Sequence, residues 1–214
     1  MSRILIIGGH GKVALLLAPL LVARGDDVTS VIRNPEHAGA VSAGGATPVV
    51  ADVESLDVSA MEAVFVGHDA IVWSAGAGGG TATRTYSVDR DAAIRSIDAA
   101  RVAGVRRYVM VSYFGARPDH GVPEGNGFFA YAESKAAADA HLRESGLEWT
   151  IVAPSALTLH EPTGRIDPDA RESGAVSRAD VASVVAAALA TPSSVGRTIR
   201  FNKGEVPISE AVGG

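Results

Sequence analysis

The chain has 214 residues, of which 47% are hydrophobic and 20% are charged, and its formal net charge is -5. This length and apolar content suffice for one domain with a full core. The acidic balance disfavours a nucleic-acid-binding surface, which needs clustered basic residues. No cysteine is present, which excludes disulfides and thiol nucleophiles, and the six histidines lack the spacing of metal ligands, so we predict no metal site.

The first apolar segment, RILIIG (residues 3–8), ends at glycine after a short run and carries no signal-peptide cleavage pattern. It is therefore predicted to be a buried strand. No run approaches the roughly 18 apolar residues of a membrane span. We expect a cytoplasmic protein that acts on a small-molecule substrate, binds neither nucleic acid nor membrane, and is a monomer or homodimer.

Short apolar runs alternate with longer alanine-rich segments of helical periodicity. Further strands are predicted at residues 27–33, 46–51, 69–75, 106–112 and 148–154, and helices at 12–24, 35–43, 55–66, 84–103 and 129–145. This alternation predicts an α/β fold, a doubly wound parallel sheet with helices on both faces. Residues 155–214 are richer in turns, with one helix at 178–192 and a last strand at 197–202.

A glycine-rich turn, GGHGKVA (residues 8–14), joins the first strand to the first helix. Glycines at such a turn let backbone N–H groups approach a pyrophosphate, and the helix N-terminus favours its negative charge. The predicted cofactor contacts here are Gly8, Gly9, His10, Gly11, Lys12 and Val13. The alternative is a tight structural turn without a ligand. A Walker-type triphosphate loop is excluded by the spacing.

The end of the second strand determines which dinucleotide is preferred. An acidic residue there would bind the ribose hydroxyls of NAD, but the chain has Arg33, whose guanidinium suits a 2'-phosphate. NADP(H) is therefore predicted over NAD(H). Lys12 could add a second positive charge or be a solvated lysine.

Further cofactor contacts are predicted where the later strands end. They are Asp52 and Val53 near the adenine, Ser74, Ala75 and Gly76 near the ribose, and Pro154 and Ser155 after the sixth strand. The glycines of the loop from Ser74 to Gly80 could instead form a flexible lid.

Together with "VIRNPE", "IVWSAGA", "YAESKAAADAHLRESGLEWTIVAPSALT" and "SRADVASVVAAAL", the glycine turn makes the chain resemble the atypical short-chain dehydrogenase/reductase superfamily, in its NmrA-like, NAD(P)H-binding subgroup. The resemblance implies a single Rossmann-like domain over residues 1–214, with 155–214 contributing a small substrate-side lobe. It also implies a catalytic Ser112, Tyr131 and Lys135. Two positions depart from the family pattern: Ala14 replaces the last turn glycine, and Ala153 replaces an arginine near the cleft.

The motif YAESK puts Tyr131 and Lys135 one helical turn apart, on one face. A neighbouring ammonium is expected to lower the pKa of the tyrosine and make it a usable acid. Tyr131 would protonate a developing alkoxide, Ser112 would bind the substrate oxygen, and Lys135 would hold the nicotinamide ribose. The pair could also be a chance coincidence of helical spacing.

Three functions remain open at this point. The first is an NADP-dependent oxidoreductase that reduces a small carbonyl, quinone or flavin-like acceptor. The second is a non-catalytic NADP(H)-binding redox sensor. The third, a sugar-nucleotide epimerase, is disfavoured by the short C-terminal lobe. Aromatic residues of the loop before YAESK, Phe114, Phe128 and Phe129, are predicted to form an apolar wall for a planar acceptor.

Overall fold

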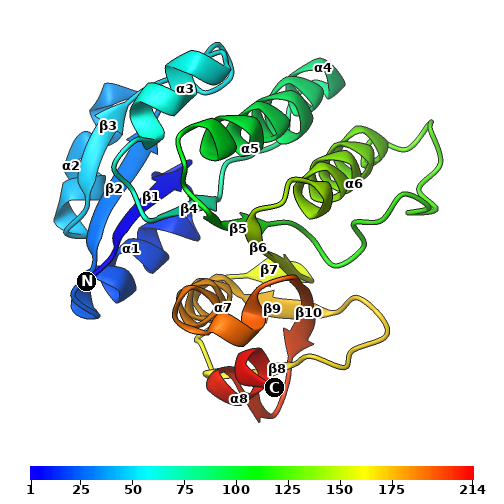
Figure 1. Cartoon of the computed structure of the whole chain (residues 1–214). Coiled ribbons are helices and arrows are strands. Elements are labelled where there is room, and N and C mark those ends of the chain that lie inside the picture. Colours follow the sequence, from blue (N-terminus) through cyan, green and yellow to red (C-terminus); the bar gives the residue numbers. More distant parts are fainter.

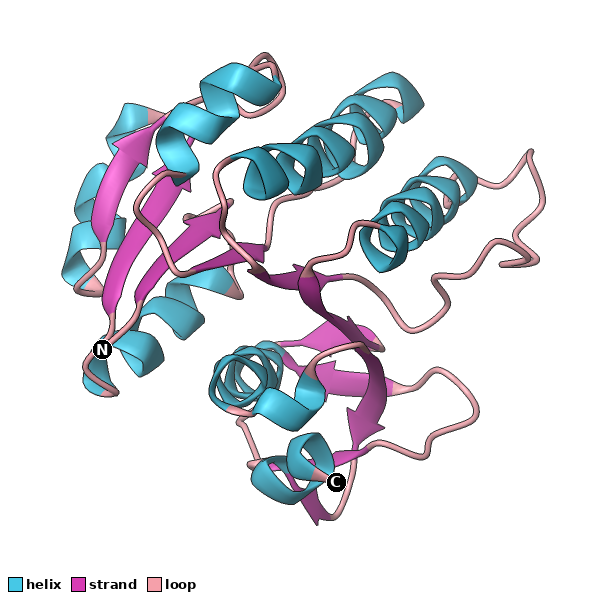
Figure 2. Ribbon diagram, viewed as in Figure 1, coloured by secondary structure: helices cyan, strands magenta, loops and turns pink.

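A mostly parallel, nine-stranded sheet runs through the molecule in the computed structural model, which describes residues 1–214 (Figures 1 and 2). The strand order is β11-β8-β10-β6-β5-β4-β1-β2-β3, and neighbours from β10 to β3 are parallel. The main strands are β1 (Arg3–Ile7), β2 (Asp27–Ile32), β3 (Thr47–Val50), β4 (Ala70–Trp73), β5 (Arg107–Val111), β6 (Glu148–Pro154) and β10 (Arg197–Lys203). Two short strands, β8 (Arg165–Asp167) and β11 (Val206–Pro207), add an antiparallel edge. A separate pair is formed by β7 (Ala156–Thr158) and β9 (Ala175–Ser177).

Helices cover both faces of the sheet, as predicted (Figure 1). They are α1 (Ala14–Ala23), α2 (Ala38–Ala43), α3 (Val58–Phe65), α4 (Ala82–Thr85), α5 (Ala93–Val102), α6 (Phe129–Glu144), α7 (Arg178–Ala190) and α8 (Ile208–Gly213). A π-helical segment, Tyr86–Ala92, joins α4 to α5. None of these helices has the length and apolar character needed to cross a membrane.

Alternate residues of the strands supply the two halves of the core. On β1, Ile4 and Ile6 pack with α1 and α7, whereas Leu5 and Ile7 pack with α3 and α5. Both faces are buried, so each parallel strand is a continuous apolar run. On the first face, Phe201 of β10 packs in the same core as Leu17 of α1. The C-terminal residues therefore share a core with the N-terminal strands.

The predicted main strands and long helices are confirmed, with shifted ends. The first helix begins at Ala14 rather than at residue 12, because the glycine turn extends to Val13. The helix predicted at 84–103 was wrong at its start: Thr81 caps α4 by accepting a hydrogen bond from the Arg84 N–H at 3.2 Å. The interior of this predicted helix contains the π-helical segment, which includes the buried Asp89.

Candidate active site

Two adjoining cavities lie at the carboxyl edge of the parallel strands. The order of the sheet reverses between β1 and β4, and in doubly wound folds ligands bind at such a switch point. Gly8 follows β1 and Ser74 follows β4 at this point. The cavities measure about 330 and 680 Å³ and share Gly11 and the segment from Ser74 to Gly76. They therefore form one continuous groove across the switch point.

The glycine turn is shaped by the close approach of β4. Gly8 has a φ of +83°, and a Cβ at this residue would lie 2.6 Å from the Ala75 Cα atom. The Gly11 N–H donates to the Gly8 carbonyl at 2.8 Å, which closes the turn. Only glycine at position 8 satisfies both the backbone conformation and this contact.

The N-terminus of α1 is left open for an anion. The N–H groups of Lys12 and Val13 donate to no carbonyl of the chain, and no side chain caps the helix. The first turn of α1 also lacks an acidic residue. Unpaired N–H groups and the positive end of a helix dipole, both facing the groove, fit a dinucleotide pyrophosphate.

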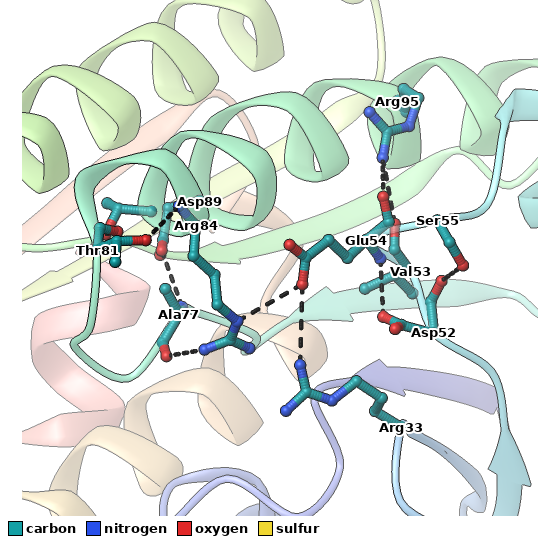
Figure 3. A network of polar contacts seen from close by, with 11 residues as sticks. Arg33, Asp52, Val53, Glu54, Ser55, Ala77, Thr81, Arg84, Asp89 and Arg95 are labelled. Carbon is teal, nitrogen blue, oxygen red and sulfur yellow. Dashed lines mark hydrogen bonds and ion pairs between the residues drawn. The ribbon is translucent and has the colours of Figure 1, made fainter.

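The smaller cavity is lined by charged side chains from two loops and a short helix. Arg33 follows β2, Glu54 follows β3, and Arg84 comes from α4. Figure 3 shows both arginines directed at the same Glu54 oxygen, Oε2, which lies 3.8 Å from Arg33 Nη1 and 3.6 Å from Arg84 Nε. Arg84 is also held by the Ala77 carbonyl, which accepts from its Nη1 at 2.5 Å. Arg33 is 57% exposed and has no closer partner, so its guanidinium is available to a ligand.

The larger cavity combines aromatic, aliphatic and cationic side chains. Phe128 and Tyr131 lie with their ring centres 5.1 Å apart and line it together with Leu157. Lys12 and Arg178 also line it, and neither forms an ion pair. Of the three phenylalanines predicted to form an apolar wall, Phe128 lines this cavity and Phe114 and Phe129 do not; Phe129 packs against His120 instead.

Helix α6 presents three polar residues at successive turns, Tyr131, Lys135 and Asp139. Lys135 is 1% exposed, and its Nζ donates to the Val111 carbonyl at 2.8 Å. Burial lowers the pKa of Lys135, whereas Asp139 and Asp89 act in the opposite direction. Two carboxylates therefore flank this buried amine.

Asp89 connects this cluster to the glycine-rich loop. Its Oδ2 accepts from the Ala77 N–H at 2.9 Å, and a Cβ on Gly76 would lie 3.0 Å from its Oδ1. Burial raises the pKa of Asp89, and the nearby Lys135 opposes that shift. A side chain at position 76 would therefore crowd this carboxylate, which holds the start of the loop through the Ala77 N–H.

Ser112, at the end of β5, faces the same cluster. Its hydroxyl donates to Asp139 Oδ2 at 2.6 Å, and both residues are buried. The other oxygen, Asp139 Oδ1, has no hydrogen-bond partner. Burial raises the pKa of Asp139 to about 6, against the opposing effects of Lys135 and Ser112.

The expected effect of Lys135 on Tyr131 was wrong. Burial raises the pKa of Tyr131, and the negative charges of Asp89 and Asp139 raise it further. The reason is that the Lys135 amine points to the Val111 carbonyl and lies between two carboxylates that offset its charge. Tyr131 is consequently a protonated phenol at neutral pH.

The structure brings most of the predicted site residues to the groove. The smaller cavity contains Gly8, His10, Arg33, Asp52 and Val53, the larger contains Lys12, Val13, Ser112, Tyr131 and Lys135, and both contain Gly11, Ser74, Ala75 and Gly76. Three residues lie outside both cavities, Gly9, Pro154 and Ser155. A Cβ on Gly9 would lie 2.5 Å from the Ser30 Cβ, so this glycine serves packing against β2. Ser155 instead donates to the Phe201 carbonyl at 3.1 Å.

Sequence reasoning missed four charged residues that line the groove, Glu54, Arg84, Asp89 and Arg178, and the buried Asp139 that is bonded to Ser112. Two of them had a usable signal: Glu54 directly follows the predicted contacts Asp52 and Val53, and Asp139 lies four residues after Lys135 and therefore on the same helix face. Arg84, Asp89 and Arg178 come from segments whose position follows only from the folded chain.

A family model described as NAD(P)H-binding matches residues 8–192. The chain belongs to this NAD(P)H-binding family. An uncharacterized sugar epimerase, YhfK of Bacillus subtilis (strain 168), is 33% identical over 98% of each chain. Two solved structures have the same fold. One is a provisional NAD-dependent epimerase/dehydratase from Bacillus halodurans, with a TM-score of 0.90, 33% identity and 99% coverage of each chain. The other is the oxidoreductase ylbE from Lactococcus lactis, with a TM-score of 0.86, 28% identity and coverage of 98% and 94%.

The matches confirm the Rossmann-like fold and the expected membership of an NAD(P)H-binding family. The chain is a member of an oxidoreductase- and epimerase-like family that binds NAD(P)H.

Proposed function

We propose that this protein is an NADP(H)-dependent reductase of a small carbonyl, quinone or flavin-like acceptor. The observation that carries the proposal is the shared cavity of Ser112, Tyr131 and Lys135, which continues into the cavity lined by Arg33. A dinucleotide laid along this groove has its adenosine end near Arg33 and its other end near Tyr131. The open N-terminus of α1 lies between them and fits the pyrophosphate.

The residues around the larger cavity have distinct roles in this reaction. A bound reduced nicotinamide supplies the hydride. Tyr131, protonated at neutral pH, donates a proton to the acceptor oxygen as that oxygen gains negative charge. Ser112 orients the same oxygen, and Lys135 offers hydrogen-bond donors to the nicotinamide ribose. The acceptor thereby gains one hydride and one proton.

Preference for NADP(H) rests on the smaller cavity. Arg33 is largely exposed there, and Arg84 approaches the same point from α4 (Figure 3). Both are held only loosely by Glu54, at 3.6–3.8 Å, so a phosphate can replace that carboxylate as their partner. An acid at the position of Arg33 would instead favour NAD(H).

The dimensions and lining of the larger cavity favour a small, planar and anionic acceptor. Its volume, about 680 Å³, matches one drug-sized ligand, and the nicotinamide end occupies part of it. Phe128 and Tyr131 offer ring faces for stacking, while the unpaired Arg178 suits a carboxylate.

Two alternatives remain. A redox sensor that only binds NADP(H) does not need a serine, tyrosine and lysine in one cavity. An epimerase is suggested by the names of the relatives from Bacillus subtilis and Bacillus halodurans. An epimerase returns the hydride to its substrate and consumes no cofactor overall, so net oxidation of NADPH separates the two reactions.

The test is NADPH oxidation with a panel of aldehydes, quinones and flavins, measured for the wild type and Tyr131→Phe. We expect turnover of at least one acceptor and a rate lower by about 10²–10⁴-fold in the variant, with NADPH affinity retained. Tight NADPH binding without any turnover would support the sensor. Equal rates for both proteins would contradict the role of Tyr131.

A further inference from the structure

We propose that Asp139 is a positioning residue that controls the direction of the Ser112 hydroxyl, so that Ser112 donates a hydrogen bond to the substrate oxygen only when Asp139 is protonated. The proposal rests on the proposed reductase function and adds a pH-dependent control to the same site.

The first observation is the geometry of the pair. Ser112 donates to Asp139 Oδ2 at 2.6 Å. The exposed fraction is 4% for Ser112 and 0% for Asp139. A hydroxyl has one proton, so Ser112 has none left for a substrate while this bond exists. In that state the Ser112 oxygen turns only its lone pairs toward the cavity, and these repel a developing alkoxide.

The second observation is the orphaned oxygen. Asp139 Oδ1 is buried without a hydrogen-bond partner, although a buried carboxylate normally has its oxygens satisfied. A proton on Asp139 removes the cost of burying this charge. The protonated carboxyl then donates to Ser112 Oγ and releases the Ser112 proton toward the cavity, where Tyr131 also lies.

The charged and titratable groups around Asp139 come from three segments. Helix α6 itself contributes Tyr131, Lys135 and Arg143, the end of β5 contributes the neighbouring Tyr113, and the π-helical segment contributes Asp89. Lys135 and Arg143 favour the charged form of Asp139, whereas burial favours the neutral form and prevails, so that its pKa is about 6. The switch between the two hydrogen-bond directions therefore falls close to neutral pH.

Asp89 offers a matched control because it is the second buried carboxylate beside Lys135. Its Oδ2 accepts from the Ala77 N–H and not from Ser112. Asp89→Asn removes the same charge from the neighbourhood of Lys135 but leaves the contact between Ser112 and Asp139 intact. Asp139→Asn can donate from its amide to Ser112 and so imitates the protonated acid at every pH.

The first experiment needs no turnover. Carbon-13 NMR of the Asp139 carboxyl is followed against pH in the wild type and in Ser112→Ala. The expected midpoint is about 6 in the wild type, and it moves upward in Ser112→Ala because the hydrogen bond to the charged form is lost. An ordinary midpoint near 4, unchanged by Ser112→Ala, would overturn the proposal.

The second experiment is the pH profile of kcat/KM for an acceptor found in the NADPH panel. The wild-type value is expected to fall by up to about tenfold per pH unit above the Asp139 midpoint, because Ser112 then ceases to donate. In Asp139→Asn, kcat/KM should no longer fall with pH. In Asp89→Asn the fall of kcat/KM should remain, even if the substitution changes the absolute rate. A fall that persists in Asp139→Asn would overturn the proposal while leaving the reductase function in place. Absence of any turnover would instead count against the reductase, and the NMR titration would still decide the role of Asp139.

Discussion

Substituting Gly8 by alanine tests the shape of the cofactor turn directly. The residue has a φ of +83°, and the new Cβ would approach Ala75 Cα at 2.6 Å and Ala75 N at 2.7 Å. The left-handed conformation costs about 1–2 kcal/mol for a residue with a Cβ. Displacing the backbone of the loop after β4 adds about 1–3 kcal/mol. We expect Gly8→Ala to lower the free energy of unfolding by roughly 2–5 kcal/mol.

Gly25→Ala isolates the first of these costs, the left-handed conformation. Gly25 has a similar φ of +89°, but a Cβ there has no heavy atom within 4 Å. A chain of this size loses about 2–4 °C in Tm per kcal/mol, so Gly25→Ala should lose about 2–8 °C and Gly8→Ala about 4–20 °C. Circular dichroism melting and urea titration measure both. Equal losses in the two variants would refute the claim that close contact with β4 requires glycine at position 8.

Three further predictions concern charged residues. Arg33→Ala should reduce the NADPH-to-NADH affinity ratio by at least about tenfold, measured by calorimetry, because a charge-assisted contact to the 2'-phosphate is lost; an unchanged ratio would contradict the assignment. Arg178→Ala should raise KM for carboxylated acceptors but not for neutral ones of similar shape. The Arg3 guanidinium holds the pKa of Asp69 at about 2, below its usual 3.8. The pair therefore stabilises the fold above about pH 4 and loses this effect as pH falls toward 2, so urea titrations of wild type and Asp69→Asn should converge at low pH.

The main sheet could be predicted from the sequence because strands buried on both faces are continuous apolar runs, as in RILII of β1. The strands β7, β8, β9 and β11 escaped prediction because they have two or three residues, too few to show a period. The first helix begins at Ala14, two residues later than predicted, because the side chains of Lys12 and Val13 do not indicate that the glycine turn extends through them.

The site was predictable where position along the chain fixes position in the fold. Gly8, Arg33, Ser74 and Ser112 each follow a parallel strand, and such strand ends meet at one edge of the sheet. The direction of a side chain was not predictable. Lys135 turns to the Val111 carbonyl, which reversed the expected effect on the tyrosine pKa.

Aspartates far along a helix gave a weaker signal. Asp139 is one of five charged residues in the alanine-rich helix α6, a composition that ordinarily marks a solvated face. Only the packing of α6 against β5 shows that it is buried and bonded to Ser112.

Hydride transfer can be followed most directly with NADPH that carries deuterium at the transferable position of the nicotinamide. The labelled cofactor is incubated with the protein and the acceptors that support NADPH oxidation, and the products are analysed by mass spectrometry. For an acceptor that is reduced at carbon, such as an aldehyde, the expected result is one deuterium per product molecule with equal consumption of NADPH. A quinone or flavin receives the deuterium on oxygen or nitrogen and loses it to water, so equal consumption of NADPH and acceptor is the expected result there. Tight binding of NADPH with no consumption of any acceptor, or exchange of substrate configuration without consumption of NADPH, would contradict a reductase.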